Sequence, residues 1–422
     1  MSSRKAGLPF ILVTLFLDIL GIGLIIPIMP KLLGSFLHGN DEVTARYYGV
    51  FAACYAMMQL VFSPILGSLS DRFGRRKVLL LSTFGQGIDY LFLAMAPGLW
   101  WLFVGRIIAG ITGASISTAT AYIADITPPE KRAQNFGLVG AAFGLGFIVG
   151  PAVGGLLGHV NLHLPFFVAS GLTLVNCTYG FFVLPESLPV ENRRPFSWAR
   201  ANPFGTLKAL SGYAPLVKMA GVVFLAQLGQ FSLQTTWVLY TSHRYGWNEA
   251  MVGASLATVG ISTAIVQGGL VRKIMPKLGE KRALLFGLML SAVVFVAYGL
   301  APQGWMVFVI LPFGALAGLS GPAAQSLMSR LVKPSEQGML QGGLSSLQSI
   351  GQVLGPLMAT NLFSFFISDR APVKIEGMAF FVAAVILLLG AALAALNFKQ
   401  HPEFAAPVPN IGSTTDATPA GH

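Results

Sequence analysis

The sequence predicts an all-α membrane protein whose twelve transmembrane helices form two six-helix bundles. Of its 422 residues, 54% are hydrophobic and only 10% are charged, whereas a soluble domain carries about 25% charged residues. Twelve apolar stretches are long enough, at about 20 residues, to cross a bilayer core about 30 Å thick. An internal repeat divides the twelve into two sets. A soluble enzyme is therefore excluded, and no catalytic residue is expected.

The predicted spans cover residues 8–29, 47–69, 78–96, 99–122, 136–158, 165–184, 216–240, 250–271, 283–300, 304–329, 339–367 and 377–397. The first span follows Arg4 and Lys5, as the core of a signal peptide would. It is longer than such a core and no small-residue cleavage site follows it, so we expect it to remain as a helix.

The basic residues are distributed unevenly between the two predicted sides. If the amino terminus is cytoplasmic, 21 of the 27 Lys and Arg residues lie on the cytoplasmic side, and Arg106 lies within the membrane. The outer side holds Lys31, Arg46, Arg244, Arg370 and Lys374. Because cytoplasmic loops are enriched in Lys and Arg, the net charge of +11 indicates membrane topology and not a nucleic-acid partner. We expect a multi-pass protein of the cell inner (plasma) membrane with both termini cytoplasmic.

A shift of 205 residues aligns the chain with itself, without gaps, over about eighty residues. The coincident residues include proline and tryptophan: Gly74 with Gly279, Pro97 with Pro302, Trp100 with Trp305, Gly150 with Gly355 and Pro151 with Pro356. Two bundles in the same orientation are typical of parallel repeats in transporters, with the substrate site between them. We therefore expect bundles at 1–184 and 216–398, a cytoplasmic linker at 185–215 and a disordered cytoplasmic tail at 399–422.

The two copies differ in the charges placed deep in the membrane. At the same shift, three charged residues align with apolar ones: Asp18 with Val223, Asp89 with Val294 and Arg106 with Leu311. A carboxylate in the membrane needs a wet cavity, a partner or a proton. Asp18 and Asp89 are therefore candidate proton carriers, with Arg106 as a nearby cation. The alternative is that either carboxyl only forms polar contacts between helices.

The cysteines and histidines give no sign of a disulfide framework or a metal site. Cys54 and Cys177 fall within apolar spans. The histidines fall in outer loops or in the tail, so we expect solvated positions for His38, His159, His163, His243, His401 and His422. No Gly-Lys pair occurs, which excludes a Walker-type phosphate loop and an ATP-driven pump made by this chain alone. The expected coupling ion is the proton, with no other cofactor.

Residues 67–77 form a predicted loop between the second and third spans. It places glycines, an aspartate and basic residues at short spacing: Gly67, Asp71, Arg72, Gly74, Arg75 and Arg76. This loop resembles the signature loop of the major facilitator superfamily. By that resemblance, the aspartate lies near a helix N-terminus and pairs with basic groups across the two bundles, so these residues form a gate that holds one conformation closed. The alternative is an ordinary basic loop, which would not need the glycines or Asp71.

Two further elements resemble motifs of the same family. The fifth span carries small residues and a proline like those of the antiporter motif: Gly146, Gly150, Pro151, Gly154 and Gly155. Small residues allow close helix packing, and proline removes a backbone hydrogen bond. Packing without any role in exchange is the alternative. In the fourth span, Arg106 with Gly110 and Gly113 resembles the arginine motif, which is thought to assist proton coupling.

These elements, together with residues of helices one, three and ten, resemble the tetracycline/proton antiporters; the additional residues are Asp18, Asp89, Tyr90, Gly321 and Pro322. The resemblance is strongest over residues 10–160. Those exporters usually carry an acidic residue in helix nine, where this chain has Ser291, and some carry a histidine in helix eight, where it has Ser262 or Thr263. The resemblance therefore implies drug/proton exchange more than it implies tetracycline itself.

Neutral polar residues at helical spacing predict the wall of a substrate cavity. Glutamines recur on one face of the seventh span and on one face of the eleventh. The candidate cavity residues are Gln59, Gln227, Gln230, Gln234, Trp237, Gln325, Gln341 and Gln348. For any single glutamine, hydrogen bonding between helices is the alternative.

The leading hypothesis is proton-coupled efflux of a small amphipathic, tetracycline-like drug by a monomeric antiporter in the lipid bilayer. A symporter or uniporter of an endogenous metabolite would use the same scaffold. A receptor or scaffold without transport is a third hypothesis, against which the gate loop argues. Proton release on substrate binding distinguishes the first hypothesis from the second, because a symporter takes up protons.

We expect the linker 185–215 to be cytoplasmic, because the basic residues concentrate on that side. A protease added outside intact cells should leave the linker uncleaved, and the same protease should cleave it in inverted membrane vesicles. Cleavage of the linker in intact cells would show that the topology is reversed.

Overall fold

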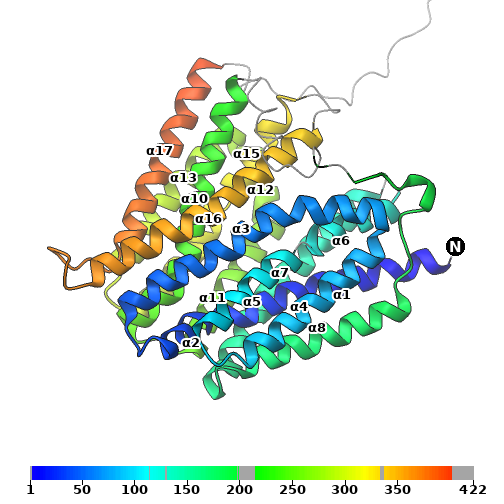
Figure 1. The fold of residues 1–422 in the computed structure, drawn as a ribbon. Helices are drawn as coiled ribbons and strands as arrows, with labels where there is room; N and C mark the ends of the chain where they lie inside the picture. Colours follow the sequence, from blue (N-terminus) through cyan, green and yellow to red (C-terminus); the bar gives the residue numbers. More distant parts are fainter. Residues whose placement is uncertain are drawn as a thin grey trace, which may run out of the picture.

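The computed structural model describes residues 2–113, 115–128, 131–196, 198, 214–332 and 337–401 (Figure 1). These residues are mostly helical, and no strand occurs among them. The first part of the chain forms α1 (Ser2–Ile25), α2 (Met29–Phe36), α3 (Asp41–Phe73), α4 (Arg75–Ala94), α5 (Leu99–Thr112), α6 (Ser115–Ile126), α7 (Arg132–Val160), α8 (Leu164–Val183) and the short 3-10 helix η2 (Val190–Asn192). We call α1–α8 the first half.

The remaining helices form the second half. They are α10 (Ala214–Tyr245), α11 (Glu249–Ile265), the π-helical segment η3 (Val266–Leu270), α12 (Val271–Leu278), α13 (Glu280–Leu300), α14 (Gly304–Ala317), α15 (Ser320–Ser329), α16 (Gln337–Ile367) and α17 (Met378–Gln400). α3 and α8 end, and α10 begins, at the same end of the bundle, which we call the terminal side. The opposite end, with α2 and the α10–α11 junction, is the far side.

The predicted twelve-helix membrane fold is confirmed. Within the described residues, eleven segments are long and apolar enough to cross a membrane. The remaining predicted span, the third along the chain, is α4, whose hydropathy is lowered by Arg75, Arg76, Lys77 and Asp89. It packs along the apolar helix α8, so it occupies a spanning position.

The predicted loop at 67–77 is wrong, because this segment is almost entirely helical. α3 continues to Phe73 and α4 begins at Arg75, so Gly74 alone forms the junction, with φ +100°. Gly279 forms the corresponding junction between α12 and α13, with φ +73°. A side chain is strained at such a φ, and glycine is not. The 205-residue shift had paired these two glycines.

Two predicted spans are each built from two consecutive helices. The fourth span consists of α5 and α6, and the tenth consists of α14 and α15. α5 ends at a C-cap formed by Gly113, and α14 ends at a C-cap formed by Gly318. These glycines are also separated by the repeat shift, so the two copies share the break in this span.

The same set of helix pairs recurs in the two halves. In the first half, α1 packs along α7, α4 along α8 and α3 along α5. In the second, α10 packs along α16, α13 along α17 and α11 along α14. The repeat predicts these pairs to be equivalent. The domain boundaries remain predictions, since residues 197, 199–213 and 402–422 of the linker and tail lie outside the described residues.

The halves contact each other mainly through two helix pairs, α3 with α16 and α7 with α11, and to a smaller extent through α3 with α10. In Figure 1, α3 and α16 run side by side between the other helices of the two halves. The α7–α11 contact is a contact between backbones: a Cβ on Gly253 would lie 3.2 Å from the Cα of Gly155 and would overlap the carbonyl oxygen of Pro151. Small residues allow helices to approach this closely in a membrane.

Substituting Gly253 by valine should loosen the contact between the halves on the far side, because the new side chain would overlap the backbone of α7. Thr44 is 4% exposed and lines a pocket of about 420 Å³ between the halves. The test uses a protein in which Cys54 and Cys177 have been replaced and Thr44→Cys has been introduced. Adding Gly253→Val should raise the rate of maleimide labelling at position 44 several-fold.

Gly268→Val is the matched control on the same span. Nothing lies within 4 Å of the position that its Cβ would occupy. Equal labelling in the two valine variants would contradict the assigned contact.

Candidate functional site

A central cavity of about 700 Å³ lies along the second half. Seven of the eight candidate cavity residues line it: Gln227, Gln230, Gln234, Trp237, Gln325, Gln341 and Gln348. They come from α10, α15 and α16, and the first half contributes Phe147 of α7. The Trp237 indole N–H donates to Ser255 Oγ at 3.0 Å, and its ring lies 5.0 Å from the ring of Tyr298 in an edge-on arrangement. The amphipathic periodicity of the glutamines therefore placed them on the cavity face of their helices.

Gln59 is the exception, because it is not among the cavity-lining residues. Its amide instead donates to the Tyr55 hydroxyl at 3.1 Å and to the carbonyl oxygen of Gly113 at 3.5 Å, where α5 ends. The second half repeats this contact, since Gln267 donates to the carbonyl oxygen of Gly318 at 3.3 Å, where α14 ends. A broken helix leaves carbonyl groups without helical partners, and the glutamine amides satisfy one such carbonyl in each half.

The cavity also contains residues that the sequence did not single out as its wall. Thr263 of α11 and Ser291 of α13 both line the cavity, and Ser262 does not. Thr263 and Ser291 are positions at which this chain departs from the tetracycline/proton antiporters that it resembles. Tyr298 of α13 and Gln267 of η3 complete this side. The departures from the resembled family therefore face the cavity.

The deep charges of the first half form a separate buried charge cluster, which we define as Asp18, Asp89 and Arg106. Asp18 is 1% exposed and Asp89 is not exposed, and neither lines the cavity. Among the described residues, neither carboxyl oxygen of Asp89 accepts a hydrogen bond. Its carboxyl packs against α5, since a Cβ on Gly105 would lie 3.0 Å from Asp89 Oδ1. The side chain therefore lies in a closely packed interior.

Arg106 is held beside these carboxyls by aromatic rings. Its guanidinium lies 5.0 Å from the ring centre of Phe51 and 5.7 Å from that of Tyr55, both on α3. It is close enough to Asp89 to interact electrostatically with it. Cation–π contacts stabilise a guanidinium without neutralising its charge, so Arg106 remains a cation next to Asp89.

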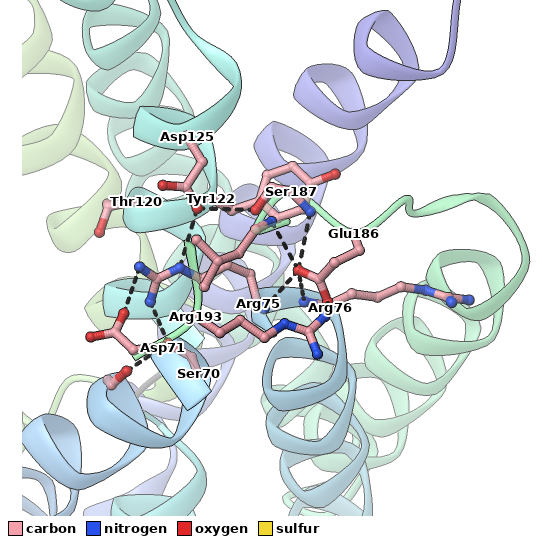
Figure 2. Close-up of polar contacts among 12 residues, drawn as sticks. Ser70, Asp71, Arg75, Arg76, Thr120, Tyr122, Asp125, Glu186, Ser187 and Arg193 are labelled. Atoms are coloured by element: carbon pink, nitrogen blue, oxygen red, sulfur yellow. Dashed lines mark hydrogen bonds and ion pairs between the residues drawn. The ribbon is translucent and has the colours of Figure 1, made fainter. Parts of the chain in front are cut away.

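The basic residues near Gly74 form a network on the terminal side (Figure 2). Arg75 pairs with Asp71 at 2.7 Å and with Asp125 of α6 at 3.2 Å, and it donates to Ser70 Oγ at 2.5 Å. Asp71 lies in the last turn of α3, where the dipole of that helix disfavours a negative charge. Arg75 compensates for this. We call these residues, with Glu186, the Arg75 network.

Glu186 attaches the beginning of the linker to this network. Its Oε1 accepts hydrogen bonds from the backbone N–H groups of Arg75 at 2.8 Å, Ser187 at 3.1 Å and Leu188 at 3.2 Å. The carboxylate thus lies at the N-terminus of α4, where the helix dipole favours negative charge. Arg193 of the linker lies 3.9 Å from the same carboxylate. Asp125 and Glu186 were not among the residues predicted from the sequence, although both are acidic residues on the same side as the basic cluster.

The other predicted gate residues have separate contacts. The Arg76 side chain donates to the carbonyl oxygen of Phe181 at 2.5 Å, although its backbone N–H also donates to Glu186 Oε1 at 3.4 Å. Arg72 stacks over Phe73 at 5.1 Å, and a Cβ on Gly67 would meet no atom within 4 Å. Within the described part of the chain, the ion pairs of Arg75, Asp71 and Arg193 all have partners at or before residue 193, and none reaches the second half. Among these described residues, the expected pairing across the two bundles is therefore not found.

The glycines of the antiporter motif place α7 between two neighbours. Gly146, Gly150 and Gly154 face α1; a Cβ on Gly150, for instance, would lie 2.8 Å from the carbonyl oxygen of Leu20. Gly155 and the carbonyl oxygen of Pro151 face α11 of the second half, whereas the ring of Pro151 lies against Gly23 of α1. One helix thus touches both the helix of Asp18 and the other half of the protein.

On the far side, charged pairs join the two halves. Lys31 of α2 pairs with Glu249 of α11, whose side chain is 3% exposed. His243 Nδ1 of α10 lies 2.6 Å from Asp41 Oδ2 of α3. His243 is exposed, as expected, although it pairs with Asp41, whereas His163 is half-buried and its Nδ1 lies 2.9 Å from the carbonyl oxygen of the last residue of α4. Only helix packing brings these partners together.

Within the described residues, no three His, Cys, Asp or Glu side chains gather as a metal site requires. The architecture and the cavity define a membrane transporter of small molecules. The family model of the Major Facilitator Superfamily matches residues 11–356 and 274–418, and the chain belongs to this superfamily.

Several relatives share most of the length of the chain. It is 41% identical to the class C tetracycline resistance protein of Escherichia coli, over 92% of this chain and 96% of that protein. It is 40% identical to the class B protein of Escherichia coli, over 89% and 93%. It is 30% identical to multidrug resistance protein 2 of Bacillus subtilis, over 86% and 90%.

Solved structures share the fold. The human organic anion transporter MFSD10 matches with a TM-score of 0.68 and 24% identity, over 93% of this chain and 99% of that chain. A bacterial homologue of the human lysosomal transporter Spinster, in an inward-facing and unoccupied conformation, matches with a TM-score of 0.74 and 16% identity, over 96% and 99%. At these identities the likeness concerns the fold alone.

Arg75→Ala should slow transport and lower the thermal stability of the purified protein, because Asp71 and Asp125 lose the cation they share. Leaving partly buried charged groups unpaired costs about 1–3 kcal/mol. Substrate affinity should change little, since Arg75 does not line the cavity. Transport rates in liposomes, equilibrium binding and thermal unfolding measure the three quantities.

Arg72→Ala is the matched comparison, because Arg72 is three residues away and its recorded contact is a stacking contact with Phe73. Its effects on rate and stability should be smaller. If Arg75→Ala and Arg72→Ala lowered the transport rate and the thermal stability equally, the Arg75 network would have no special role.

Proposed function

We propose that this transporter exports a small amphipathic drug, such as a tetracycline, in exchange for protons across the bacterial inner membrane. The observation that carries the proposal is the pair of carboxyls Asp18 and Asp89, which are 1% and 0% exposed within a membrane-spanning half. The names of the relatives, tetracycline resistance and multidrug resistance proteins, support a drug as the cargo.

The carboxyls are suited to carry the coupling proton. A charged side chain near the middle of a membrane costs at least about 2.5–3.5 kcal/mol. Among the described residues, no hydrogen-bond donor to Asp89 offsets that cost. Protonation of the carboxyl offsets it instead, because it removes the charge. Arg106 nearby stabilises the charged form instead. A site balanced between these two effects can take up a proton in one conformation and release it in another.

The cavity is suited to carry the drug. Its volume of about 700 Å³ lies within the usual range of small-molecule sites, about 300–1,000 Å³. Aromatic and aliphatic side chains form most of its wall, and glutamine amides and hydroxyl groups provide hydrogen bonds. An amphipathic molecule matches this combination.

The exchange cycle requires the halves to open alternately on the two sides. On the far side, the α7–α11 contact and the Lys31–Glu249 pair connect the halves, and these would separate to release the drug. On the terminal side, we propose that the Arg75 network keeps α3, α4, α6 and the linker together as one rigid unit during this motion. In the proposed cycle both termini are cytoplasmic. The transporter acts as a monomer, and the proton is its coupling ion.

Asp18→Asn and Asp89→Asn test the proposal in liposomes that contain the purified protein. An amide cannot bind and release the coupling proton, so each variant should lose export against the drug gradient when a pH gradient is imposed. Downhill exchange should persist, and proton release on drug binding, measured with a pH dye, should fall.

Asp369→Asn is the matched control, because this aspartate lies in the loop after α16 with a side chain 97% exposed. It should concentrate drug at the wild-type rate. If Asp18→Asn and Asp89→Asn both concentrated drug at the wild-type rate, neither carboxyl would carry the coupling proton. Proton uptake on drug binding in the wild type would favour a symporter.

A further inference from the structure

Every side chain in the described wall of the central cavity is uncharged. Among the described residues that line it, there is no Asp, Glu, Lys, Arg or His. The polar groups are the amides of seven glutamines, a few hydroxyls and backbone groups: Gln227, Gln230, Gln234, Gln267, Gln325, Gln341 and Gln348, with Thr263, Ser291, Ser320, Ser345 and Tyr298. The described part of the cavity wall is therefore polar but carries no charge.

Most of the amides are available to a ligand. Gln267 donates to the carbonyl oxygen of Gly318. Gln230, Gln234, Gln325, Gln341 and Gln348 are exposed, and none of them is hydrogen-bonded to another group in the described part of the chain. Each amide offers one acceptor and two donor hydrogens. Carbonyl and hydroxyl groups of a ligand would be bound by such a wall.

The deep charges of the first half lie outside the described cavity wall. Asp18 and Asp89 are buried in the first half and do not reach the cavity. Arg106 is stacked on Phe51 and Tyr55 and does not line it either. A ligand with a net charge would lose its hydration in this cavity without gaining a counter-charge, which is unfavourable. An uncharged molecule, or a zwitterion whose own charges compensate each other, avoids that loss.

Two positions decide this neutrality. Ser291 lies in the middle of α13 and Thr263 in α11, and both side chains line the cavity. These are the places where the resembled antiporters often carry an acidic residue or a histidine. A carboxylate at position 291 would provide the negative charge that a cation needs.

We propose that the central cavity selects amphipathic ligands of zero net charge that carry carbonyl and hydroxyl groups, and that Ser291 is a determinant of this selection. The inference rests on the proposed export function and specifies its substrate class. It also separates the drug from the coupling proton, because ligand and carboxyls do not share one space. α7 connects the two sites, since Phe147 lines the cavity and Gly150 packs on α1.

The main test compares one molecule in two charge states. Tetracycline at pH 7 with EDTA is mostly a net-neutral zwitterion, and with saturating magnesium it forms a positively charged complex. Equilibrium dialysis against the purified full-length protein measures the dissociation constant of each form. We expect the metal-free form to bind at least about tenfold tighter. Chloramphenicol, which is uncharged, should bind, and ethidium, a permanent cation, should bind at least about tenfold more weakly than metal-free tetracycline.

Ser291→Asp and Ser291→Asn separate the effect of charge from that of size. The aspartate should reduce the preference for metal-free tetracycline over the magnesium complex by at least about tenfold relative to the asparagine variant. Any change that the two variants share is due to side-chain size. If the aspartate variant does not fold, the wild-type preference decides the question alone.

Binding of the magnesium complex or of ethidium to the wild type as tightly as metal-free tetracycline would overturn this inference and leave proton-driven export standing. Equal preferences in Ser291→Asp and Ser291→Asn would remove Ser291 as a determinant. The expected order of binding without proton-driven export would overturn the proposed function alone. Failure of every probe to bind would overturn both.

Discussion

The backbone contact between α7 and α11 is the constraint on which the arrangement of the two halves depends. In a membrane, apolar helices have no hydrophobic drive to associate, so close packing of small residues takes its place. Gly155 and Gly253 allow that approach, and a side chain at Gly253 would overlap α7. On its other face α7 packs on α1 through Gly146 and Gly150. One helix therefore couples the half with the buried carboxyls to the half with the cavity.

The two halves have divided the chemistry between them. The first half holds the buried carboxyls of Asp18 and Asp89, and the second half provides a cavity whose described wall is lined by amides and carries no charge. The proposed proton exchange needs an environment that changes with conformation, whereas the proposed drug site needs space and neutral hydrogen-bonding groups. Since α7 contributes Phe147 to the cavity and also packs on the helix of Asp18, motion at one site can reach the other through direct packing.

The repeat shows which features belong to the scaffold. Gly74 and Gly279 both form one-residue junctions with positive φ, and Gly113 and Gly318 both end the first helix of a broken span. A backbone in the left-handed region requires glycine whatever the transported molecule is. The side chains that face the interior have diverged instead, as the alignment of Asp89 with an apolar residue illustrates.

The sequence by itself determined the twelve spans, the deep charges and the cavity face of α10 and α16, because bilayer thickness and helical periodicity act on each segment separately. Only the tertiary structure decided which side chains meet. Asp125 and Glu186 lie 50 and 111 residues from Arg75 in the chain, and helix packing brings them to it. Gln59 is a second example. The sequence placed it on a helix, but not next to the end of α5, whose Gly113 carbonyl it contacts. That contact with a neighbouring helix keeps Gln59 out of the cavity wall.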